Sequence, residues 1–475
     1  MGGLLTKHID DIAGCGRGSC TVCGKCKHLA VASRKKDLAK LPDWFIPERH
    51  QADSAYGIAF DIGTTTVAGI LCDLKTGTVM DAAAVANPQS AFGADVISRI
   101  HYSSLSTGNR EEIQKTIIDC LNGIISELTQ ANGIPPESVI DIIVAGNTTM
   151  GHLLLGVDAS PLARAPFKPA FRAAVTVSAI DLNLSNSPEA TVYLLPSIAG
   201  HVGADIVGVM LATALSGLPG VNLVIDIGTN GEIVLSRDGK AAACSTAAGP
   251  AFEGAAVYQG MRAATGAIES VVIHEGSVHL SVIGDTVPIG ICGSGLIDAI
   301  AQLLNAGLLD YKGRMLDRNT ALQKDIHPML AGRLYTDNKG RGFILHGDEA
   351  GGKVVLTQSD IREVQLAKGA IAAGIKILMN HMGVAAHEIN SVMIAGAFGS
   401  YVKTESALRI GLLPGVSPGK VRAIGNAAGA GACMALLSRE QRELANREAD
   451  NTLHIELSAH AGFTSMHMAS MYFPI

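Results

Sequence analysis

Two segments of this 475-residue chain share one pattern that restricts its possible folds. Residues 57–73 read GIAFDIGTTTVAGILCD, and residues 222–235 read NLVIDIGTNGEIVL. In each segment an apolar run ends on an acidic residue, a turn rich in Gly and polar residues follows, and a second apolar run begins. This pattern predicts a β-hairpin whose turn is large enough to hold a phosphate group. Because the DIGT motif occurs twice at equivalent places, it predicts a duplicated fold built around one anion.

Other landmarks follow each hairpin in the same order. VAGN at residues 144–147 and PSIAGHVGAD at 196–205 follow the first hairpin. IAGA at 394–397 and AIGNAAGAGA at 423–432 follow the second. The short runs of Ala, Val, Ile and Gly are typical of strands buried within an α/β sheet. The chain is therefore expected to be an α/β protein whose two halves repeat one plan.

Composition divides the chain into four expected parts. These are a Cys-rich segment at residues 1–30, a charged linker at 31–56, a first subdomain at 57–215 and a second at 216–475. The linker has no periodic apolar pattern, which predicts a mobile connection. The polar, charged stretch 310–352 is expected to be an insertion on the surface of the second subdomain.

Apolar periodicity predicts a long helix in each half. Residues 111–131 place Ile117, Leu121 and Ile124 on one face of the first helix. Residues 359–383 form the second, for which Ser359 is the expected N-cap.

Net charge and hydropathy exclude several classes of function. The formal net charge of −6 argues against nucleic acid as the main partner. Asp205 interrupts the longest apolar helical stretch, so no membrane span is expected. His8, Asp10 and Asp11 occupy positions where a signal peptide has its apolar core. The expected location is therefore the cytoplasm.

Four of the nine cysteines are crowded near the N-terminus, with the spacing C-x4-C-x2-C-x2-C. Thiolates this close together can surround one metal centre. The spacing satisfies both the plant-type [2Fe–2S] and the bacterial [4Fe–4S] patterns, so the cluster type stays open. Structural zinc is the alternative, because C-x2-C is also common in zinc sites. The expected metal ligands are Cys15, Cys20, Cys23 and Cys26, whereas the expected small buried apolar residues are Cys72, Cys120, Cys244, Cys292 and Cys433.

The two hairpin turns are the expected phosphate-binding elements. They bring backbone N–H groups and hydroxyls to an anion without bulky side chains. Two such turns that face each other would hold successive phosphates from both sides. The residues expected to bind the phosphates are Gly63, Thr64, Thr65 and Thr66 in the first turn and Gly228, Thr229, Asn230 and Gly231 in the second.

Acidic residues beside these turns suggest a metal ion. Asp61 and Asp226 end the strands that lead into the turns. Phosphates would repel both carboxylates directly, so the two residues are best explained by Mg²⁺ with its water ligands between them. Asp226 is also a candidate to orient an attacking water, and Glu253 in GPAFEGA is another. Asp61, Asp226 and Glu253 are therefore the expected catalytic residues of a magnesium–nucleotide site.

Two strand–helix junctions complete the expected nucleotide site. Asn147 follows a buried strand where a helix begins. The turn formed by Gly396, Ala397, Phe398 and Gly399 is expected to let a flat purine lie over its backbone, with Phe398 packed against the base. Each Gly turn alone is equally well explained as a tight corner, but the ordered set favours a shared ligand.

These motifs resemble those of the actin-like ATPase superfamily, which includes acetate and sugar kinases, heat-shock-70 proteins and actin. DIGTTT is similar to its first phosphate motif, DIGTNGE to its second and IAGAFG to its adenosine motif. Residues 57–474 resemble more closely the reductive activators of corrinoid-dependent enzymes. The patterns that carry this resemblance are NPQSAFGADVISRI, VAGNTTMGHLLLG, PSIAGHVGAD, IDIGTNGEI, AAGPAFEGA, CGSGLID and DIREVQLAKGAI.

The resemblance implies a duplicated actin-like (ribonuclease-H-like) ATPase core of two lobes. It implies an ATP-dependent one-electron reductase that returns the cobalt of a corrinoid protein from inactive Co(II) to Co(I). The implied cofactors are ATP, Mg²⁺ and an Fe–S cluster. The implied partners are the corrinoid protein of a methyltransferase system and an upstream electron donor, and a homodimer is compatible with the resemblance.

The N-terminal part departs from the family pattern. Known patterns place a β-grasp [2Fe–2S] domain before the core or a ferredoxin module after it, whereas about fifty residues precede the core here and no Cys follows Cys433. Two other functions therefore stay open. One is activation of another low-potential enzyme, such as a 2-hydroxyacyl-CoA dehydratase. The other is a non-redox ATP-driven switch with zinc in the Cys-rich segment.

Overall fold

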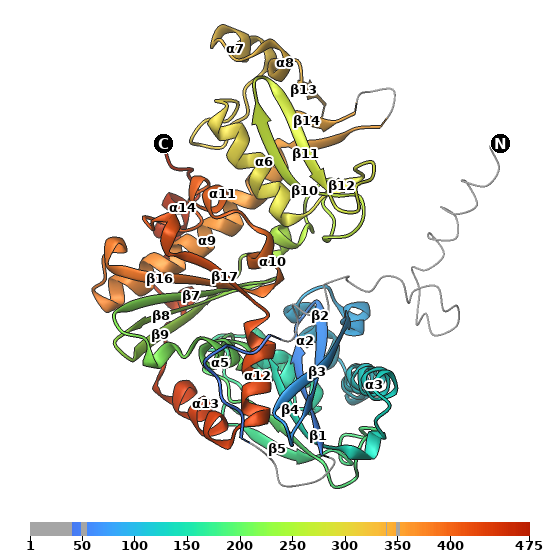
Figure 1. Cartoon of the computed structure of the whole chain (residues 1–475). Helices are drawn as coiled ribbons and strands as arrows, with labels where there is room; N and C mark the ends of the chain where they lie inside the picture. The colour runs from blue at the N-terminus through green and yellow to red at the C-terminus, as the bar shows by residue number, and fades with distance from the viewer. Residues whose placement is uncertain (1–39, 49–54, 339, 348–351) are drawn as a thin grey trace, which may run out of the picture.

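The structure is a computed structural model that describes residues 40–48, 55–338, 340–347 and 352–475 (Figure 1). The first hairpin belongs to a six-stranded sheet with the strand order β3-β2-β1-β4-β6-β5. In this sheet β1 pairs antiparallel with β2 and parallel with β4. The strands are β1 (Tyr56–Ile62), β2 (Thr66–Asp73), β3 (Thr78–Ala86), β4 (Val139–Gly146), β5 (Val175–Ser178) and β6 (Thr191–Leu194).

The second hairpin belongs to another six-stranded sheet, with the order β17-β16-β7-β8-β9-β18. Here β7 pairs antiparallel with β8 and parallel with β16, as β1 does with β2 and β4. Five strands of each sheet thus follow the same plan, which confirms the duplicated α/β fold. The strands are β7 (Val221–Ile227), β8 (Gly231–Arg237), β9 (Lys240–Thr246), β16 (Ile389–Ala395), β17 (Val421–Gly425) and β18 (Leu453–His454).

Two helices lie between the sheets, α5 (Ala204–Thr213) and α12 (Ala427–Leu437) (Figure 1). One apolar cluster combines residues of both sheets with residues of these helices, including Ile143 of β4 and Val224 of β7. The helices approach closely because glycines face each other: a Cβ atom at Gly431 would lie 1.9 Å from the carbonyl oxygen of Gly208. The chain therefore returns from the second sheet to pack against the first.

Other helices surround the two sheets. The helices are α2 (Val96–Ser104), α3 (Thr107–Ala131), α4 (Thr148–Leu154), α9 (Gln358–Met382), α10 (Gly396–Tyr401), α11 (Thr404–Arg409), α13 (Arg439–Asn451) and α14 (Phe463–Ser470). The long helix of each half packs an apolar stripe against the strands, as the periodicity of residues 111–131 predicted for the first, whereas α11, α13 and α14 pack mainly on other helices.

The N-cap expected for α9 was wrong. Thr357, not Ser359, caps the helix: its side chain accepts a hydrogen bond from the N–H of Asp360, and the Asp360 carboxylate accepts one from the N–H of Thr357. This capping box satisfies two backbone donors at once, whereas a cap at Ser359 would satisfy one.

The segment 310–352 is more than a surface insertion. Its described residues contribute two strands to a separate three-stranded sheet, and Phe343 and Leu345 are buried there. Alternating apolar residues in an otherwise polar stretch are the reason, because they form one buried sheet face. Together with residues 267–305 and 354–357, the described residues of this segment form the part of the second lobe drawn at the top of Figure 1. Its elements are β10 (Ala267–His274), β11 (Ser277–Val282), β12 (Gly290–Ile291), α6 (Gly293–Asn305), α7 (Arg318–Gln323), α8 (Pro328–Ala331), β13 (Leu334–Asp337), β14 (Gly340–His346) and β15 (Val354–Thr357).

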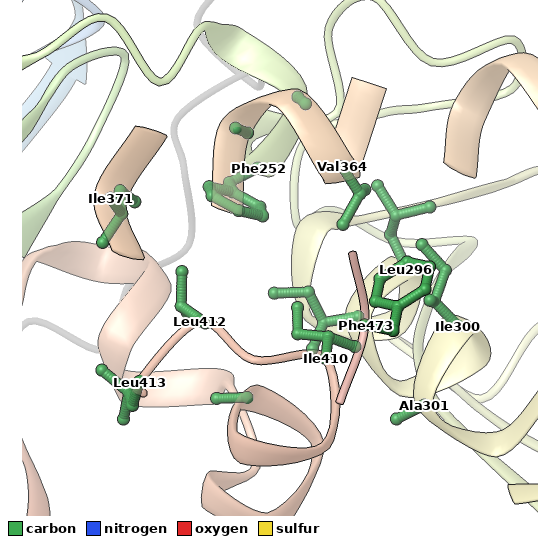
Figure 2. Packing of buried hydrophobic residues seen from close by; sticks show 14 of the residues in the cluster. Phe252, Leu296, Ile300, Ala301, Val364, Ile371, Ile410, Leu412, Leu413 and Phe473 are labelled. Atoms are coloured by element: carbon green, nitrogen blue, oxygen red, sulfur yellow. The ribbon is translucent and has the colours of Figure 1, made fainter. Parts of the chain in front are cut away.

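The C-terminal residues are anchored in the core of the second lobe. Figure 2 shows Phe473 packed near Leu296 and Ile300 of α6. The buried ammonium group of Lys368 donates a hydrogen bond of 2.5 Å to the carbonyl oxygen of Tyr472. The tail thus joins α6 to α9.

The prediction of a mobile linker was wrong for residues 40–48. Phe45 packs beside the cluster between the two sheets. The N–H of Glu48 donates to the carbonyl of Leu437 at 2.9 Å, and its carboxylate accepts a hydrogen bond of 2.5 Å from Ser438, the N-cap of α13. An apolar contact and a helix cap therefore fix this segment to the lobe that carries the first hairpin.

Four of the five scattered cysteines are buried as predicted, and Cys120 is half-buried. In the described part of the chain, no helix combines the length and apolar character needed to cross a membrane.

Candidate functional site

The two hairpin turns lie at the tips of equivalent strands. In the first, the N–H of Gly63 donates to the carbonyl of Thr66 at 2.9 Å. In the second, the N–H of Gly228 donates to the carbonyl of Asn230 at 2.9 Å. These bonds close each turn and leave small residues at its tip.

The carboxylate of Glu253 connects the two turns. Thr65 donates its hydroxyl proton to one carboxylate oxygen at 2.8 Å, and Thr229 donates to the other at 2.7 Å. Glu253 ends a short 3-10 helix (Pro250–Glu253) that follows the second hairpin. The structure thus brings Thr65, Thr229 and Glu253 together, and a single small anionic group spans the distance between the turns.

Two asparagines hold the first turn from behind. Asn147, the N-cap of α4, donates its amide to the hydroxyl oxygen of Thr64 at 3.0 Å. Asn87 donates its amide to the carbonyl oxygen of Gly63 at 2.8 Å. Asn147 therefore contacts the first turn directly, which is consistent with its expected place in the nucleotide site.

The carboxyl groups of Asp61, Asp205, Asp226 and Glu232 are near enough for their charges to shift one another's pKa. Burial and the nearby charge of Asp205 raise the pKa of Asp61 to about 7. Burial and the charges of Asp205 and Asp61 raise the pKa of Asp226 to about 7. Burial raises the pKa of Asp205 to about 6, and burial together with the charges of Asp205 and Asp226 raises the pKa of Glu232 well above its usual value. A cation among these groups would favour their ionised forms.

The carboxyls fit a cation held partly through water. Within the described ranges, no three His, Cys, Asp or Glu side chains converge as direct ligands of one metal ion. Mg²⁺ commonly keeps several water ligands and binds only one or two carboxylates together with phosphate oxygens. The arrangement of Asp61 and Asp226 is consistent with such binding. The expected cluster ligands Cys15, Cys20, Cys23 and Cys26 lie outside the described residues.

The expected adenosine turn is the beginning of a helix. Residues Gly396–Tyr401 form α10 directly after β16, so the four residues expected to form a turn are the first turn of a helix. Gly396 has a φ of +85°, and a Cβ atom there would lie 2.8 Å from the carboxylate of Asp226. A glycine at this corner lets the strand turn into the helix beside Asp226. Gly396 thus lets α10 begin directly beside the carboxylate of Asp226. The helix also contains Ala397, Phe398 and Gly399.

Sequence reasoning missed several residues of this site. Asp205 and Glu232 lie within motifs quoted above, and each is an acidic residue inside an apolar element, which was an available signal. Asn426 caps α12 after β17, as Asn147 caps α4 after β4, and its side chain is hydrogen-bonded to Asp61. Arg99 of α2, which donates a hydrogen bond to the carbonyl oxygen of Thr64 at 2.6 Å, lies within the quoted pattern NPQSAFGADVISRI, and a single Arg in that pattern was the available signal.

Comparison with known proteins matches both lobes of the chain. Residues 56–217 match the family described as the RACo middle region, and residues 220–475 match the C-terminal domain of RACo, the ASKHA domain. The second match alone covers more than half of the chain.

Individual relatives agree with this match. The chain is 40% identical over 435 residues to the corrinoid activation enzyme RamQ of Eubacterium limosum, covering 90% of this chain and 72% of that protein. It is 25% identical over 404 residues to a reductase of the Co(II) methylated amine-specific corrinoid protein of Methanosarcina barkeri, covering 78% and 68%. A solved reductive activator for a corrinoid, iron-sulfur protein superposes with a TM-score of 0.78 at 36% identity, over 89% of this chain and 67% of that one. This chain belongs to the RACo family of actin-like ATPases.

Proposed function

We propose that this protein is an ATP-dependent reductive activator that returns a corrinoid protein from Co(II) to Co(I). The observation that carries the ATP-dependent part is the Glu253 carboxylate, which accepts hydrogen bonds from Thr65 and Thr229 at once. One group with acceptor oxygens thus contacts both turns, as the phosphates of a nucleotide would. The names of the relatives support the corrinoid part.

The residues have separate roles in this proposal. The turns 63–66 and 228–231 bind the phosphates through N–H groups and hydroxyls, and Gly396 opens the adenosine side beside α10. Asp61 and Asp226 face a hydrated Mg²⁺, which neutralises phosphate charge when bound. Asp226 or Glu253 orients the attacking water. The raised pKa values of both aspartates support a site completed by a cation.

The four N-terminal cysteines supply the proposed electron-transfer centre. Cys15, Cys20, Cys23 and Cys26 have the spacing of Fe–S ligands. An upstream donor provides one electron, and Co(II) accepts it to become Co(I). Each step of about 59 mV uphill requires about 1.4 kcal/mol for one electron. ATP binding and hydrolysis would shift the lobes between states of different affinity for the cytoplasmic corrinoid partner.

The test uses full-length protein purified without oxygen. Iron and sulfide analysis with a visible spectrum should report an Fe–S cluster, which Cys20→Ser should remove. Addition of ATP and a low-potential reductant should convert a Co(II) corrinoid protein to Co(I), as followed by absorbance. Asp226→Asn should keep the cluster and lose this conversion. One zinc per chain without iron would instead support a non-redox switch.

A further inference from the structure

Arg99 of α2 is a buried cation directly behind the first phosphate turn. Its side chain is 0% exposed. It donates hydrogen bonds to the carbonyl oxygen of Thr64 at 2.6 Å and to that of Gly93 at 3.0 Å. Burial lowers the pKa of Arg99 to about 10, so the guanidinium still carries its charge at neutral pH.

No carboxylate in the described part of the chain forms an ion pair with Arg99. Asp95 lies near enough to favour the charged guanidinium but does not bond to it. A buried charge without a partner is unfavourable unless an opposite charge binds nearby. The surroundings of Arg99 are therefore incomplete without an anion at the turn.

All four carbonyl groups of the turn 63–66 accept hydrogen bonds from the protein. This leaves none of them available to repel an anion. The bonds run from Asn87 Nδ2 to Gly63 O at 2.8 Å, from Arg99 to Thr64 O at 2.6 Å, from Asn87 N to Thr65 O at 2.9 Å and from Gly63 N to Thr66 O at 2.9 Å.

These carbonyl bonds set the direction of the N–H groups. In a trans peptide, the carbonyl of one residue and the N–H of the next point to opposite sides. Since Arg99 holds the carbonyl of Thr64, the N–H of Thr65 is directed away from Arg99. Among the described residues, neither this N–H nor that of Thr64 has an acceptor. The hydroxyl of Thr65 already reaches Glu253 at 2.8 Å.

In the ranges that the structure describes, no cation holds the second turn as Arg99 holds the first. The hydroxyl of Thr246 donates to the carbonyl of Gly231 at 3.0 Å, and the N–H of Gly228 donates to the carbonyl of Asn230 at 2.9 Å. No arginine or lysine in the described residues bonds to this turn. The duplicated turns are thus chemically different: as far as the structure describes the chain, a fixed positive charge lies behind the first turn and not behind the second.

We propose that Arg99 is a positioning residue for phosphate recognition. It orients the Thr64–Thr65 peptide so that its N–H faces the phosphates, and it places a permanent charge behind them without touching the nucleotide. The inference rests on the proposed function, because it requires a nucleotide at this turn. With Arg99 behind it, the first turn is the part of the site that favours negatively charged phosphates.

The test compares binding of ADP with Mg²⁺ and of adenosine, using calorimetry on the full-length protein. Arg99→Met should weaken ADP binding by about 10-fold to 100-fold, which is the range for losing a hydrogen bond to a charged group. Adenosine binding should change less than about two-fold, because adenosine has no phosphate. Arg99→Lys keeps the charge but not the planar fork, and should weaken ADP binding by less than Arg99→Met.

Arg110→Met is the matched control. Arg110 lies in α3 of the same lobe and pairs with Asp158 at 3.8 Å, so its loss should leave ADP binding unchanged. Equal effects of Arg99→Met on ADP and adenosine, or an unfolded Arg99→Lys protein, would overturn the inference by showing a role in packing alone. If the wild type binds ADP and Arg99→Met binds it equally well, this inference fails but the proposed function stands. If the wild type binds no ADP, both fail.

Discussion

Thr65 donates a hydrogen bond of 2.8 Å to Glu253, a residue 188 positions later in the chain. The other oxygen of the same carboxylate accepts from Thr229. The contact therefore joins the tips of the two hairpins. A ligand whose oxygens bind both turns must rearrange these bonds, which places Glu253 beside any group held there.

Replacing Glu253 tests its role in water activation. Glu253→Gln keeps an acceptor for the threonine hydroxyls but loses the negative charge. The ATPase kcat should fall about 100-fold, the lower range for losing a positioned acid–base group. ADP affinity should change little. Steady-state hydrolysis assays check this, with the exposed Glu111→Gln as control, and an unchanged kcat would remove Glu253 from the catalytic residues.

Asp226 is expected to lower the stability of the metal-free protein and to strengthen the binding of Mg²⁺. Asp226→Asn removes one of the clustered negative charges, so the metal-free protein should have a higher Tm at pH 8, where the aspartates of the wild type are mostly ionised. The Mg²⁺ concentration needed for half-maximal ATPase activity should rise at least about 10-fold. Thermal melts in chelator and Mg²⁺ titrations measure the two effects. A lower Tm would show that Asp226 stabilises the fold instead.

The contact between α5 and α12 should not tolerate a methyl group. Gly431→Ala would place a Cβ atom 1.9 Å from the carbonyl oxygen of Gly208, so the helices must separate. The free energy of unfolding should fall by about 1–3 kcal/mol.

Gly123→Ala in α3 is the control for this change. A Cβ atom at Gly123 meets nothing within 4 Å, so helix propensity should dominate. Alanine there should raise the free energy of unfolding by up to about 1 kcal/mol. Denaturant titrations measure the free energy of unfolding of both variants. An equal change for Gly431→Ala and Gly123→Ala would argue against a steric contact at Gly431.

Lys368 should make stability depend on pH above neutrality. Burial lowers the pKa of Lys368 to about 7, whereas the unfolded chain has the ordinary value near 10.5. Between these values the unfolded state binds one more proton, so the free energy of unfolding rises with pH, and below pH 7 this contribution is constant. Compared with Lys368→Met, the wild type should gain at most about 1.4 kcal/mol per pH unit from pH 7 to 9. A constant difference in urea titrations would contradict a lowered pKa.

Much of the fold could be predicted because it depends on local patterns. Apolar runs separated by Gly-rich turns predicted both hairpins, and the periodicity of residues 111–131 predicted α3. The predictions failed where a longer-range or reciprocal contact decides the outcome. Thr357 caps α9 because Asp360 completes a capping box, and Glu48 fixes residues 40–48 because Ser438 lies within its reach.

The sequence alone determined the duplicated plan, the two turns and the acidic residues beside them, because each follows from residue types at short spacing. Only the tertiary structure decided which groups act together. The bridge from Thr65 through Glu253 to Thr229 and the buried Arg99 behind Thr64 join residues that are distant in the chain. The contact of Thr65 with Glu253 forms when the two sheets pack around α5 and α12, whereas Arg99 reaches Thr64 when α2 packs within the first lobe, and no local pattern records either contact.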